Sequence, residues 1–334
     1  MKKITMQDVA LKAGVSKSTV SQYINNRFEF MAMPTRLRVE AAIEELGYIP
    51  NQVAKSLKQK KTGTIGVIVA NILHTFSTEI IRAIEDECER NGFHLFVCNA
   101  DDQPEKERSY IDTLVAKQVD GLIIFPTNGN YDYYEQLKKA EFPIVFVDRM
   151  INNPIFPTLL LDNEKASEIA VEQLVKKGRG KISLISTSIN QNVTPRIERI
   201  AGYKKAMAMQ GLSIDEEWII AKNRHEIVNE LQCLWDSGNR PEAFFATNDL
   251  ALIELLKFLK KNNIAVPEDV GVIAIDDSPF LEIATSPISV IKQPTFEIGK
   301  HAAKTLLKLI VSKEFNETYE EERYLPVLIE REST

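Results

Sequence analysis

The pattern of hydrophobic and polar positions changes near residue 63. Before that point, apolar residues recur about one helical turn apart, as with Val9 and Ala13 and again with Val20 and Ile24, which predicts short amphipathic helices. After it, short apolar runs such as TIGVIVA, GLIIFP and VGVIAID alternate with longer helical stretches such as EKASEIAVEQLVKKG. The pattern therefore predicts a small helical module followed by a larger α/β body.

Residues at the expected helix ends support the helical module. Thr5 and Asp8 have the spacing of a capping pair, Gly14 can adopt the positive φ that ends a helix, and Ser16 can cap the next one. A third helix is marked by a proline in its first turn, an apolar stripe and a terminal glycine: Pro34, Val39, Ile43, Leu46 and Gly47. Two helices around a tight turn, with a third behind them, predict a helix-turn-helix.

The exposed positions of the second helix carry hydroxyl, amide and ammonium groups. Such side chains hydrogen-bond base edges and phosphates, and we expect Lys17, Ser18 and Gln22 to meet base edges in the major groove. Phosphate contacts are expected from Thr5, Ser16, Thr19, Ser21, Asn25 and Thr35. The alternative, a solvated polar face of a small bundle, does not explain why so few acids lie there.

Residues 50–62 form a basic segment between the module and the body. Pro50 and Asn51 can start a short helix with Ala54 and Leu57 on one side, but it is too short to be stable alone. One interpretation is a flexible charged linker. The other is a hinge that folds on DNA, with Leu57 inserted into a minor-groove step and Ala54, Lys55 and Lys58 beside it.

Charge is divided between the two parts. Residues 1–61 hold 11 Lys or Arg and 5 acids; since the chain has 41 and 47 of these, the remainder holds 30 and 42. A basic module on an acidic body is typical of a DNA-binding protein whose second domain has another role. We therefore expect a DNA-binding domain at 1–49, a hinge at 50–62 and an effector-binding and dimerisation domain at 63–334.

The body has more predicted strands than a single sheet usually holds. We therefore predict two similar lobes, each with parallel strands and helices on both faces of the sheet. We place lobe 1 at about 63–162 and 293–321, and lobe 2 at about 163–292 and 322–334. Ligands bind in such folds at the carboxyl ends of the strands, in the cleft between lobes.

Polar and aromatic residues gather at the predicted strand ends. The candidates for ligand contact are Phe76, Ser77, Thr127, Asp148, Arg149, Arg199, Asn248, Asp276 and Gln293. Carboxylates, amides and an arginine around an aromatic ring are the groups that bind sugars. Taken singly, each of these residues fits a role in a helix cap or a turn about as well as ligand contact. Asn163 and Asp249 could be helix N-caps.

The motifs DVALKAGVSKSTVSQYINN and LGYIPNQVAKSLKQKKTGTIGVIV resemble the lactose-repressor/galactose-repressor family of bacterial transcription regulators. Later matches are VDGLIIFP, VFVDR, RIAGY, FFATNDLALIELL, DVGVIAIDD and VIKQP. The resemblance implies a homodimer on a palindromic operator, with Lys17 and Ser18 leading the recognition helix and Leu57 as the hinge leucine. It places the ligand residues at Phe76, Asp148, Arg199, Asn248, Asp276 and Gln293.

Two departures from the family pattern stand out. Gln22 replaces a frequent arginine, and glutamine pairs better with adenine than with the guanine that arginine prefers. The loop RFEFMAMP also lacks the Val-Ser start expected for the third helix. The operator is therefore expected to differ at the base pair that Gln22 meets.

The effector is expected to be a sugar or a sugar acid. Arg149 and Arg196 add positive charge beside Arg199, which favours an anionic effector such as a sugar acid or a sugar phosphate. The chain also resembles the repressors of ketodeoxygluconate and pectin-sugar catabolism. The alternative is that Arg149 pairs with a neighbouring carboxylate. We predict no cofactor and no metal, because His74, His94, His225 and His301 are scattered and the three cysteines lack metal-site spacing.

Other function classes fit the chain less well. A dinucleotide-dependent enzyme needs a glycine-rich turn after its first strand, and none follows Gly66 here. A periplasmic solute-binding protein needs an export signal, and a cytosolic sugar-binding protein leaves residues 1–61 unexplained. A global catabolite regulator that depends on a co-repressor is a further alternative. We expect a cytoplasmic, ligand-responsive repressor without a membrane segment.

Overall fold

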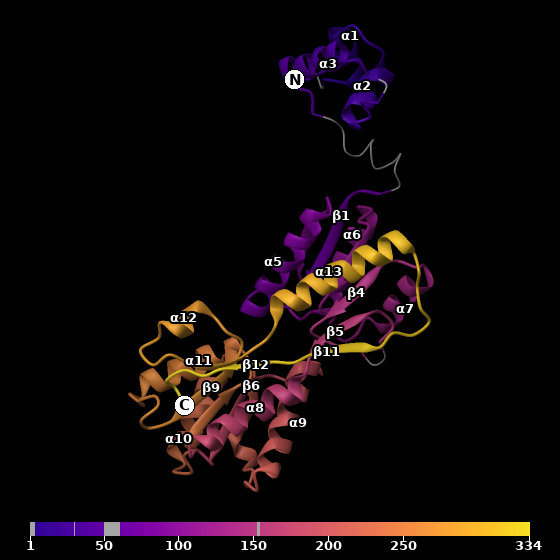
Figure 1. Ribbon diagram of the computed structural model, residues 1–334. Coiled ribbons are helices and arrows are strands. Elements are labelled where there is room, and N and C mark those ends of the chain that lie inside the picture. The colour runs from indigo at the N-terminus through magenta and orange to yellow at the C-terminus, as the bar shows by residue number, and fades with distance from the viewer. Residues whose placement is uncertain (1–3, 30, 50–60, 152–153) are drawn as a thin grey trace. The chain divides into compact units, whose positions relative to one another are not determined.

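The structure is a computed structural model that describes residues 4–29, 31–49, 61–151 and 154–334. The chain divides into two compact units, one ending at Thr62 and the other beginning at Gly63 (Figure 1). The predicted hinge residues Ala54, Lys55, Leu57 and Lys58 lie outside the described residues.

The first unit contains the three helices α1 (Met6–Ala13), α2 (Lys17–Ile24) and α3 (Met33–Leu46). Thr5 and Asp8 form the expected capping box, and Ser16 caps α2 by accepting from the Thr19 N–H. Gly14 (φ 62°) and Gly47 (φ 59°) end α1 and α3 in the left-handed conformation, as predicted. One core of buried apolar side chains joins the helices: Val9, Ala10, Ala13, Val20, Val39, Ala42 and Tyr48.

The loop before α3 is held by an aromatic cluster. Its N-cap residue, Ala32, makes no side-chain capping bond, and Pro34 lies in the first turn. The Phe28 ring instead packs edge-on against Tyr23 at 5.7 Å, and the Arg36 guanidinium lies 4.0 Å from its centroid. These contacts stabilise a helix start that lacks the side-chain cap expected at that position.

Lobe 1 of the second unit is a six-stranded parallel sheet in the order β11-β5-β4-β3-β1-β2. Its strands are β1 (Thr64–Val69), β2 (His94–Asn99), β3 (Gly121–Ile124), β4 (Ile144–Val147), β5 (Thr158–Leu161) and β11 (Glu321–Tyr324). Helices α5 (Thr75–Arg90) and α13 (Thr295–Ser312) cover one face. Helices α6 (Pro104–Ala116) and α7 (Tyr131–Lys139) cover the other.

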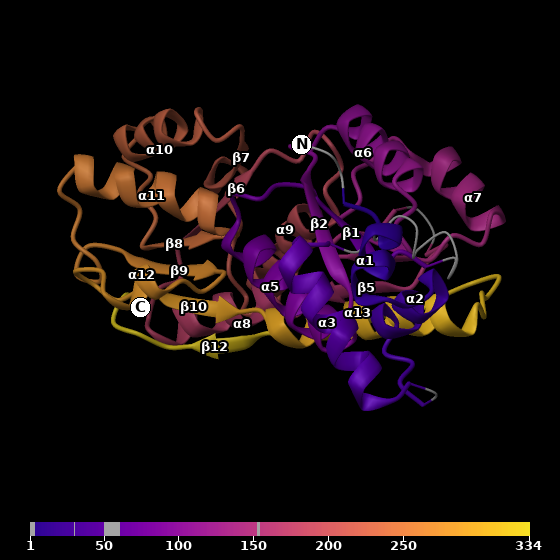
Figure 2. The same cartoon turned by 90° about the horizontal axis from the view of Figure 1, so that it is seen from above.

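Lobe 2 repeats this plan in the order β12-β10-β9-β8-β6-β7, with β12 antiparallel to β10. Its strands are β6 (Ile182–Thr187), β7 (Ile219–Lys222), β8 (Ala243–Ala246), β9 (Gly271–Ile275), β10 (Ser289–Lys292) and β12 (Val327–Ile329). Helices α8 (Asn163–Lys176) and α9 (Thr194–Met209) pack on one face, and α10 (Ile227–Asp236) and α11 (Asp249–Lys261) on the other (Figure 2). The one-turn helix α12 (Pro279–Glu282) follows β9.

The chain passes between the lobes after β5, after β10 and after β11. The expected return to lobe 2 at residue 322 is wrong by three residues, because Glu321–Tyr324 pairs with Thr158–Leu161 in the lobe 1 sheet. The segment EERY forms an edge strand, and an edge strand tolerates polar and charged side chains. Its sequence therefore lacks the hydrophobic pattern that predicts a buried strand. Strands β7 and β12 are likewise short edge strands that hydrophobic periodicity does not reveal.

One glycine in each lobe allows two helices to pack closely. A Cβ at Gly299 of α13 would lie 2.7 Å from Ala83 Cβ of α5, and a Cβ at Gly202 of α9 would lie 2.7 Å from Glu164 Cα of α8. Such distances leave no room for a side chain. Helix α5, which packs on α13, carries Phe76, and α9, which packs on α8, carries Arg199. The close packing therefore fixes the positions of two candidate ligand residues.

Candidate functional site

A cavity of about 40 Å³, partly open to solvent, lies between the two lobes. Its lining includes all but one of the predicted ligand residues: Phe76, Ser77, Asp148, Arg149, Arg199, Asn248, Asp276 and Gln293. Thr127, the remaining one, lines an adjoining cavity of about 20 Å³ that shares Arg149 and Val193 with the first. We call the larger cavity the inner chamber and the smaller one the outer chamber.

Arg199 projects from α9 and is only 4% exposed. Its Nε donates to Asn163 Oδ1 at 2.8 Å and its Nη1 to the Thr247 carbonyl at 2.6 Å. Within the described residues, no carboxylate lies at ion-pair distance from this guanidinium. A buried guanidinium held by neutral acceptors keeps its full charge for a ligand oxygen in the inner chamber.

Asp276 and Gln293 form a buried pair opposite the arginine. Gln293 Nε2 donates to Asp276 Oδ1 at 2.6 Å, while Gln293 Oε1 is buried and has no hydrogen-bond partner among the described residues. Burial, reinforced by the nearby Asp249 carboxylate, raises the pKa of Asp276 to about 6. The pair therefore leaves one acceptor unsatisfied in the inner chamber, which a ligand hydroxyl can bond.

Asp148 and Asp276 occupy matching positions in the two lobes. Each follows the third strand in the sheet order, β4 or β9, and each has a positive φ, 70° and 81°. Residues with side chains rarely adopt this conformation, and such strain is typical of functional sites. The turn directs two carboxylates from opposite lobes to the same chamber.

Asn248 both caps a helix and lines the chamber. Its Oδ1 accepts from the Ala251 N–H at 2.9 Å, and its Nδ2 donates to Thr187 Oγ1 at 3.2 Å. The caps expected at Asn163 and Asp249 are each displaced by one residue, since Asp162 and Asn248 are the N-cap residues. Asn163 is instead free to hold Arg199.

His74 and Asp249 join the lobes at the edge of the inner chamber. His74 Nδ1 lies 2.5 Å from Asp249 Oδ1, and Asp249 Oδ2 accepts from the Thr75 N–H at 2.7 Å. Burial acts to raise the pKa of Asp249, but the bonds from His74 and from the Thr75 and Leu250 N–H groups outweigh it and lower that pKa. This contact joins the start of α5 in lobe 1 to the start of α11 in lobe 2.

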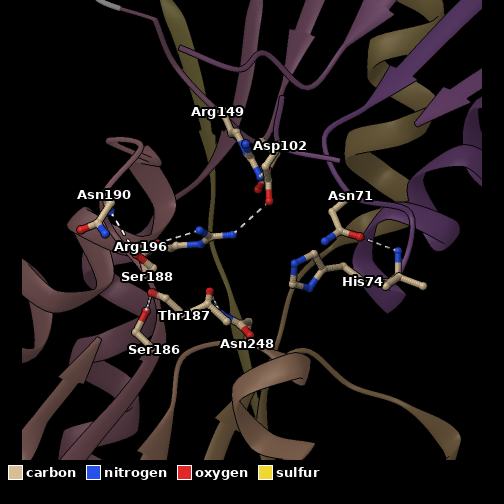
Figure 3. A network of polar contacts seen from close by, with 12 residues as sticks. Asn71, His74, Asp102, Arg149, Ser186, Thr187, Ser188, Asn190, Arg196 and Asn248 are labelled. Atoms are coloured by element: carbon tan, nitrogen blue, oxygen red, sulfur yellow. Dashed lines mark hydrogen bonds and ion pairs between the residues drawn. The ribbon is translucent and has the colours of Figure 1, made fainter. Parts of the chain in front are cut away.

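Arg149 and Arg196 share a carboxylate across the cleft (Figure 3). Arg149 Nη2 donates to Asp102 Oδ1 at 2.6 Å, and its Nε lies 3.5 Å from Asp148 Oδ2. Arg196 Nη2 lies 3.5 Å from Asp102 Oδ2, and its Nη1 donates to the Ser188 carbonyl at 2.7 Å. The alternative that Arg149 pairs with a neighbouring carboxylate is thus confirmed, and it removes the main argument for an anionic effector.

Sequence reasoning missed several residues of the cleft. Asn71 and His74 line the inner chamber and follow β1, so the strand-end rule that found Phe76 could have found them. Val193 and Pro195 come from the segment before and at the start of α9, where only the tertiary fold brings them to the chamber. Asp102 follows β2 and carried no signal beyond its position.

The helix-turn-helix unit presents its expected base-reading side chains to solvent. Lys17, Ser18 and Gln22 are exposed on α2. Of the expected phosphate contacts, Thr5 and Ser16 are exposed N-cap residues, and four are half-buried: Thr19, Ser21, Asn25 and Thr35. Asn25 Nδ2 donates to the Ser21 carbonyl at 2.7 Å, which holds the end of α2.

Comparisons with known proteins agree with this architecture. Residues 5–51 match the family model for bacterial regulatory proteins of the lacI family, and residues 171–334 match that for a periplasmic binding protein-like domain. The chain is 44% identical over 332 residues to the probable HTH-type transcriptional regulator EndR of Paenibacillus polymyxa, covering 98% of both chains. The chain belongs to the LacI family.

Further members of the LacI family are similar over nearly the whole length. The HTH-type transcriptional regulator KdgR of Bacillus subtilis (strain 168) is 31% identical, with 92% of this chain and 91% of KdgR covered. The lac repressor dimer bound to operator and the anti-inducer ONPF superposes with a TM-score of 0.85 at 25% identity, covering 99% of both chains. A complex of the transcriptional regulator CelR with cellobiose gives 0.73 at 26%, covering 99% of this chain and 100% of CelR.

As a LacI-family member, the chain is a DNA-binding transcriptional regulator and not an enzyme. In the described part of the chain, no helix combines the length and the apolar character needed to cross a membrane. The first unit matches the model of lacI-family regulators and the second matches that of a periplasmic binding protein-like domain, so the cleft of the second unit is the candidate ligand site.

Proposed function

We propose that this chain is a homodimeric repressor whose affinity for a palindromic operator is controlled by a sugar bound in the inner chamber. The observation that carries the proposal is the set of hydrogen-bonding groups that converge there from both lobes, with Arg199, Asn248 and Asp276 on one side and Asp148 on the other. Such groups bind adjacent hydroxyls in pairs.

The inner chamber also offers an apolar surface for a sugar ring. Phe76 and Phe125 both line it and pack edge-to-face with centroids 6.2 Å apart. A pyranose ring has an apolar face of C–H groups and a rim of hydroxyls, so it matches an aromatic side chain beside carboxylates and amides. The cellobiose complex of the similar regulator CelR supports a sugar ligand for this chain.

Charge balance favours a neutral sugar over a sugar acid. The two chambers are lined by three arginines, Arg149, Arg196 and Arg199, and by three aspartates, Asp102, Asp148 and Asp276. His74 has its own partner in Asp249. No surplus of positive charge remains to offset the desolvation of an anionic ligand.

Control of DNA binding follows from how the lobes are joined. The contacts from His74 to Asp249 and from Arg196 to Asp102 cross the cleft, so a ligand between them changes the free energy of closure. In the dimer, a change in lobe angle alters the spacing of the two segments at 50–62 that lead to the helix-turn-helix units. A coupling of about 1–3 kcal/mol shifts operator affinity about 5–150-fold.

The proposal is tested by measuring operator binding of the full chain while neutral monosaccharides, disaccharides and sugar acids are titrated in. Fluorescence anisotropy on DNA selected by the protein from random sequence gives both the operator and its affinity. At least one sugar is expected to change that affinity more than fivefold. If no sugar binds the full chain in calorimetry, the cleft has been assigned the wrong ligand class.

Effector binding is expected to weaken below about pH 6. Asp276 accepts sugar hydroxyls as a carboxylate, and its pKa in the unliganded protein is about 6. Protonation below that pH removes the acceptor. Where binding requires the ionised carboxylate, effector affinity falls by up to about tenfold for each further pH unit. Calorimetry between pH 5 and 8 measures this, and Asp276→Asn removes the contribution of this group. The opposite slope, tighter binding at pH 5, contradicts the role of the carboxylate.

The folded protein alone has the reverse pH dependence at this residue. A carboxyl whose pKa is raised from 3.8 to about 6 by folding binds its proton more tightly in the native state. Asp276 therefore contributes to stability as pH falls from about 7 toward 4, the same range in which effector affinity is lost. Effector affinity thus falls with decreasing pH while the contribution of Asp276 to stability rises, so measuring both separates the loss of ligand contacts from the loss of fold.

A further inference from the structure

Arg199, the buried arginine of the inner chamber, is linked through Asn163 to the junction of the two lobes. Asn163 is the first residue of α8 and is 1% exposed. Its Oδ1 accepts from Arg199 Nε at 2.8 Å, and its Nδ2 donates to Glu198 Oε2 at 2.8 Å and to the Leu161 carbonyl at 3.3 Å. The amide therefore uses its oxygen for the guanidinium and its nitrogen for two acceptors.

The Glu198 carboxylate determines which way this amide points. An ionised carboxylate accepts hydrogen bonds and has none to donate, so it holds the Nδ2 end of Asn163. The Oδ1 end then faces the Arg199 Nε–H, which needs an acceptor. A rotated amide would place two donors against each other, because a guanidinium accepts no hydrogen bond. Glu198 thus orients Arg199 through Asn163.

The same carboxylate is paired with an arginine of the other lobe. Arg323 lies in β11 of lobe 1, whereas Glu198 lies in α9 of lobe 2. Arg323 Nη2 donates to Glu198 Oε1 at 2.8 Å, and its Nη1 donates to Oε2 at 3.1 Å. The two side chains are 29% and 21% exposed, so solvent screens their attraction only in part. A bidentate pair fixes both the distance and the orientation between α9 and β11.

This ion pair lies where the chain passes between the lobes. Strands β5 and β11 are neighbours in lobe 1, and each leads into lobe 2 (Figure 1). Arg323 Nη1 also donates to the Leu161 carbonyl at 3.3 Å, and the Asp162 N–H donates to the Tyr324 carbonyl at 2.9 Å. These bonds tie the two crossover segments together. The Leu161 carbonyl also accepts from Asn163, so the network reaches from the inner chamber to both crossovers.

We propose that Glu198 and Arg323 are positioning residues of the effector response. Glu198 orients Arg199, and Arg323 transmits a displacement of that arginine to the crossover segments. The inference rests on the proposed function and adds the residues through which the response passes. A sugar that draws the guanidinium toward itself competes for the bond to Asn163, and so displaces a network that has contacts in both lobes. Rotation of the lobes about the crossovers shifts the same contacts.

Nuclear magnetic resonance of arginine Nε–H groups in the full chain tests the role of Glu198 without any sugar. The Arg199 Nε–H is buried and hydrogen-bonded, so its proton is expected to exchange slowly with water. Its signal is identified by its loss in Arg199→Lys. In Glu198→Ala the exchange of this proton is expected to become at least about tenfold faster, because its acceptor is no longer held in place. Unchanged exchange overturns the positioning role of Glu198.

Glu164→Ala is the matched control for this measurement. Glu164 of α8 pairs with Lys205 of α9 at 3.0 Å, so it joins the same two helices, and the Asn163 amide has its hydrogen bonds elsewhere. The control is expected to leave the exchange of the Arg199 proton unchanged. Thermal melting shows whether each variant is folded, and if Glu198→Ala does not fold, the second experiment decides.

That experiment measures operator binding by the full chain while glucose, galactose, cellobiose and galacturonate are titrated in separately. Arg323→Gln breaks the ion pair but leaves Glu198 in place to hold Asn163. The sugar that acts on the parent protein is expected to bind this variant with an affinity within about twofold of the parent's. Its effect on operator affinity is expected to be at least about threefold smaller, since coupling and binding are separate free energies.

The outcomes separate the inference from the proposed function. If a sugar changes the operator affinity of the parent protein and of Arg323→Gln equally, the ion pair is structural only and the proposed function stands. If none of the four sugars acts on the parent protein, the proposed function fails and the role of Arg323 fails with it. The exchange of the Arg199 proton decides the role of Glu198 in either case.

Discussion

Replacement of Arg199 with alanine is expected to weaken effector binding at least about a hundredfold and to abolish the effector's influence on operator binding. Arg199 is buried in the inner chamber with no carboxylate partner within the described residues, so a bound sugar receives charge-assisted hydrogen bonds from it. Each such bond contributes about 1.5–3 kcal/mol, and two of them account for the expected loss.

The measurement must separate the pocket from the fold. Arg199 also bonds Asn163 and Thr247, so the variant is expected to melt at a lower temperature than the parent protein. Operator binding without effector requires a folded dimer and should persist. Arg224→Ala removes a more exposed arginine that pairs with Glu254 and provides a control of equal charge. A normal effector response in Arg199→Ala would remove this residue from the proposed site.

Gln22→Ala is expected to relax the choice of base at one position of each half-site by about 5–150-fold. Gln22 is exposed on α2 together with Lys17 and Ser18. A glutamine amide can donate and accept at once, which suits the edge of adenine in the major groove. Loss of the amide therefore reduces discrimination at that base pair more than it reduces affinity for unrelated DNA.

Binding to a set of operators with single substitutions, at one fixed salt concentration, measures this effect. Gln7→Ala makes the same chemical change at an exposed position of α1 and should leave the preference for each base unchanged. Equal weakening on every DNA sequence would show that Gln22 meets the backbone rather than a base.

Features that depend on nearby residues were predictable from the sequence. The capping box of Thr5 and Asp8, the Ser16 cap and the left-handed Gly14 involve partners within four positions of one another. The alternation of strands and helices likewise predicts two lobes, because parallel strands require helical crossovers. The strand-end rule accounts for seven of the eight predicted residues in the inner chamber because parallel strands end at a common edge, whereas Arg199 lies within α9.

Features set by distant partners were not predictable. Arg149 looked like positive charge available to a ligand, yet it pairs with Asp102, 47 positions away. The edge strand Glu321–Tyr324 is recognisable only from its pairing with Thr158–Leu161. Whether a polar side chain at a strand end faces a ligand or an ion-pair partner depends on the other lobe, and no periodicity in the sequence encodes that.

The contact between His74 and Asp249 makes the state of the cleft visible by spectroscopy. The chain has four histidines, and His74 is the one that lines the inner chamber. Selective labelling of histidine rings thus yields a small set of nuclear magnetic resonance signals, of which one comes from a ring bonded across the cleft. Its chemical shift should follow lobe opening and closing in solution, without any probe attached to the protein.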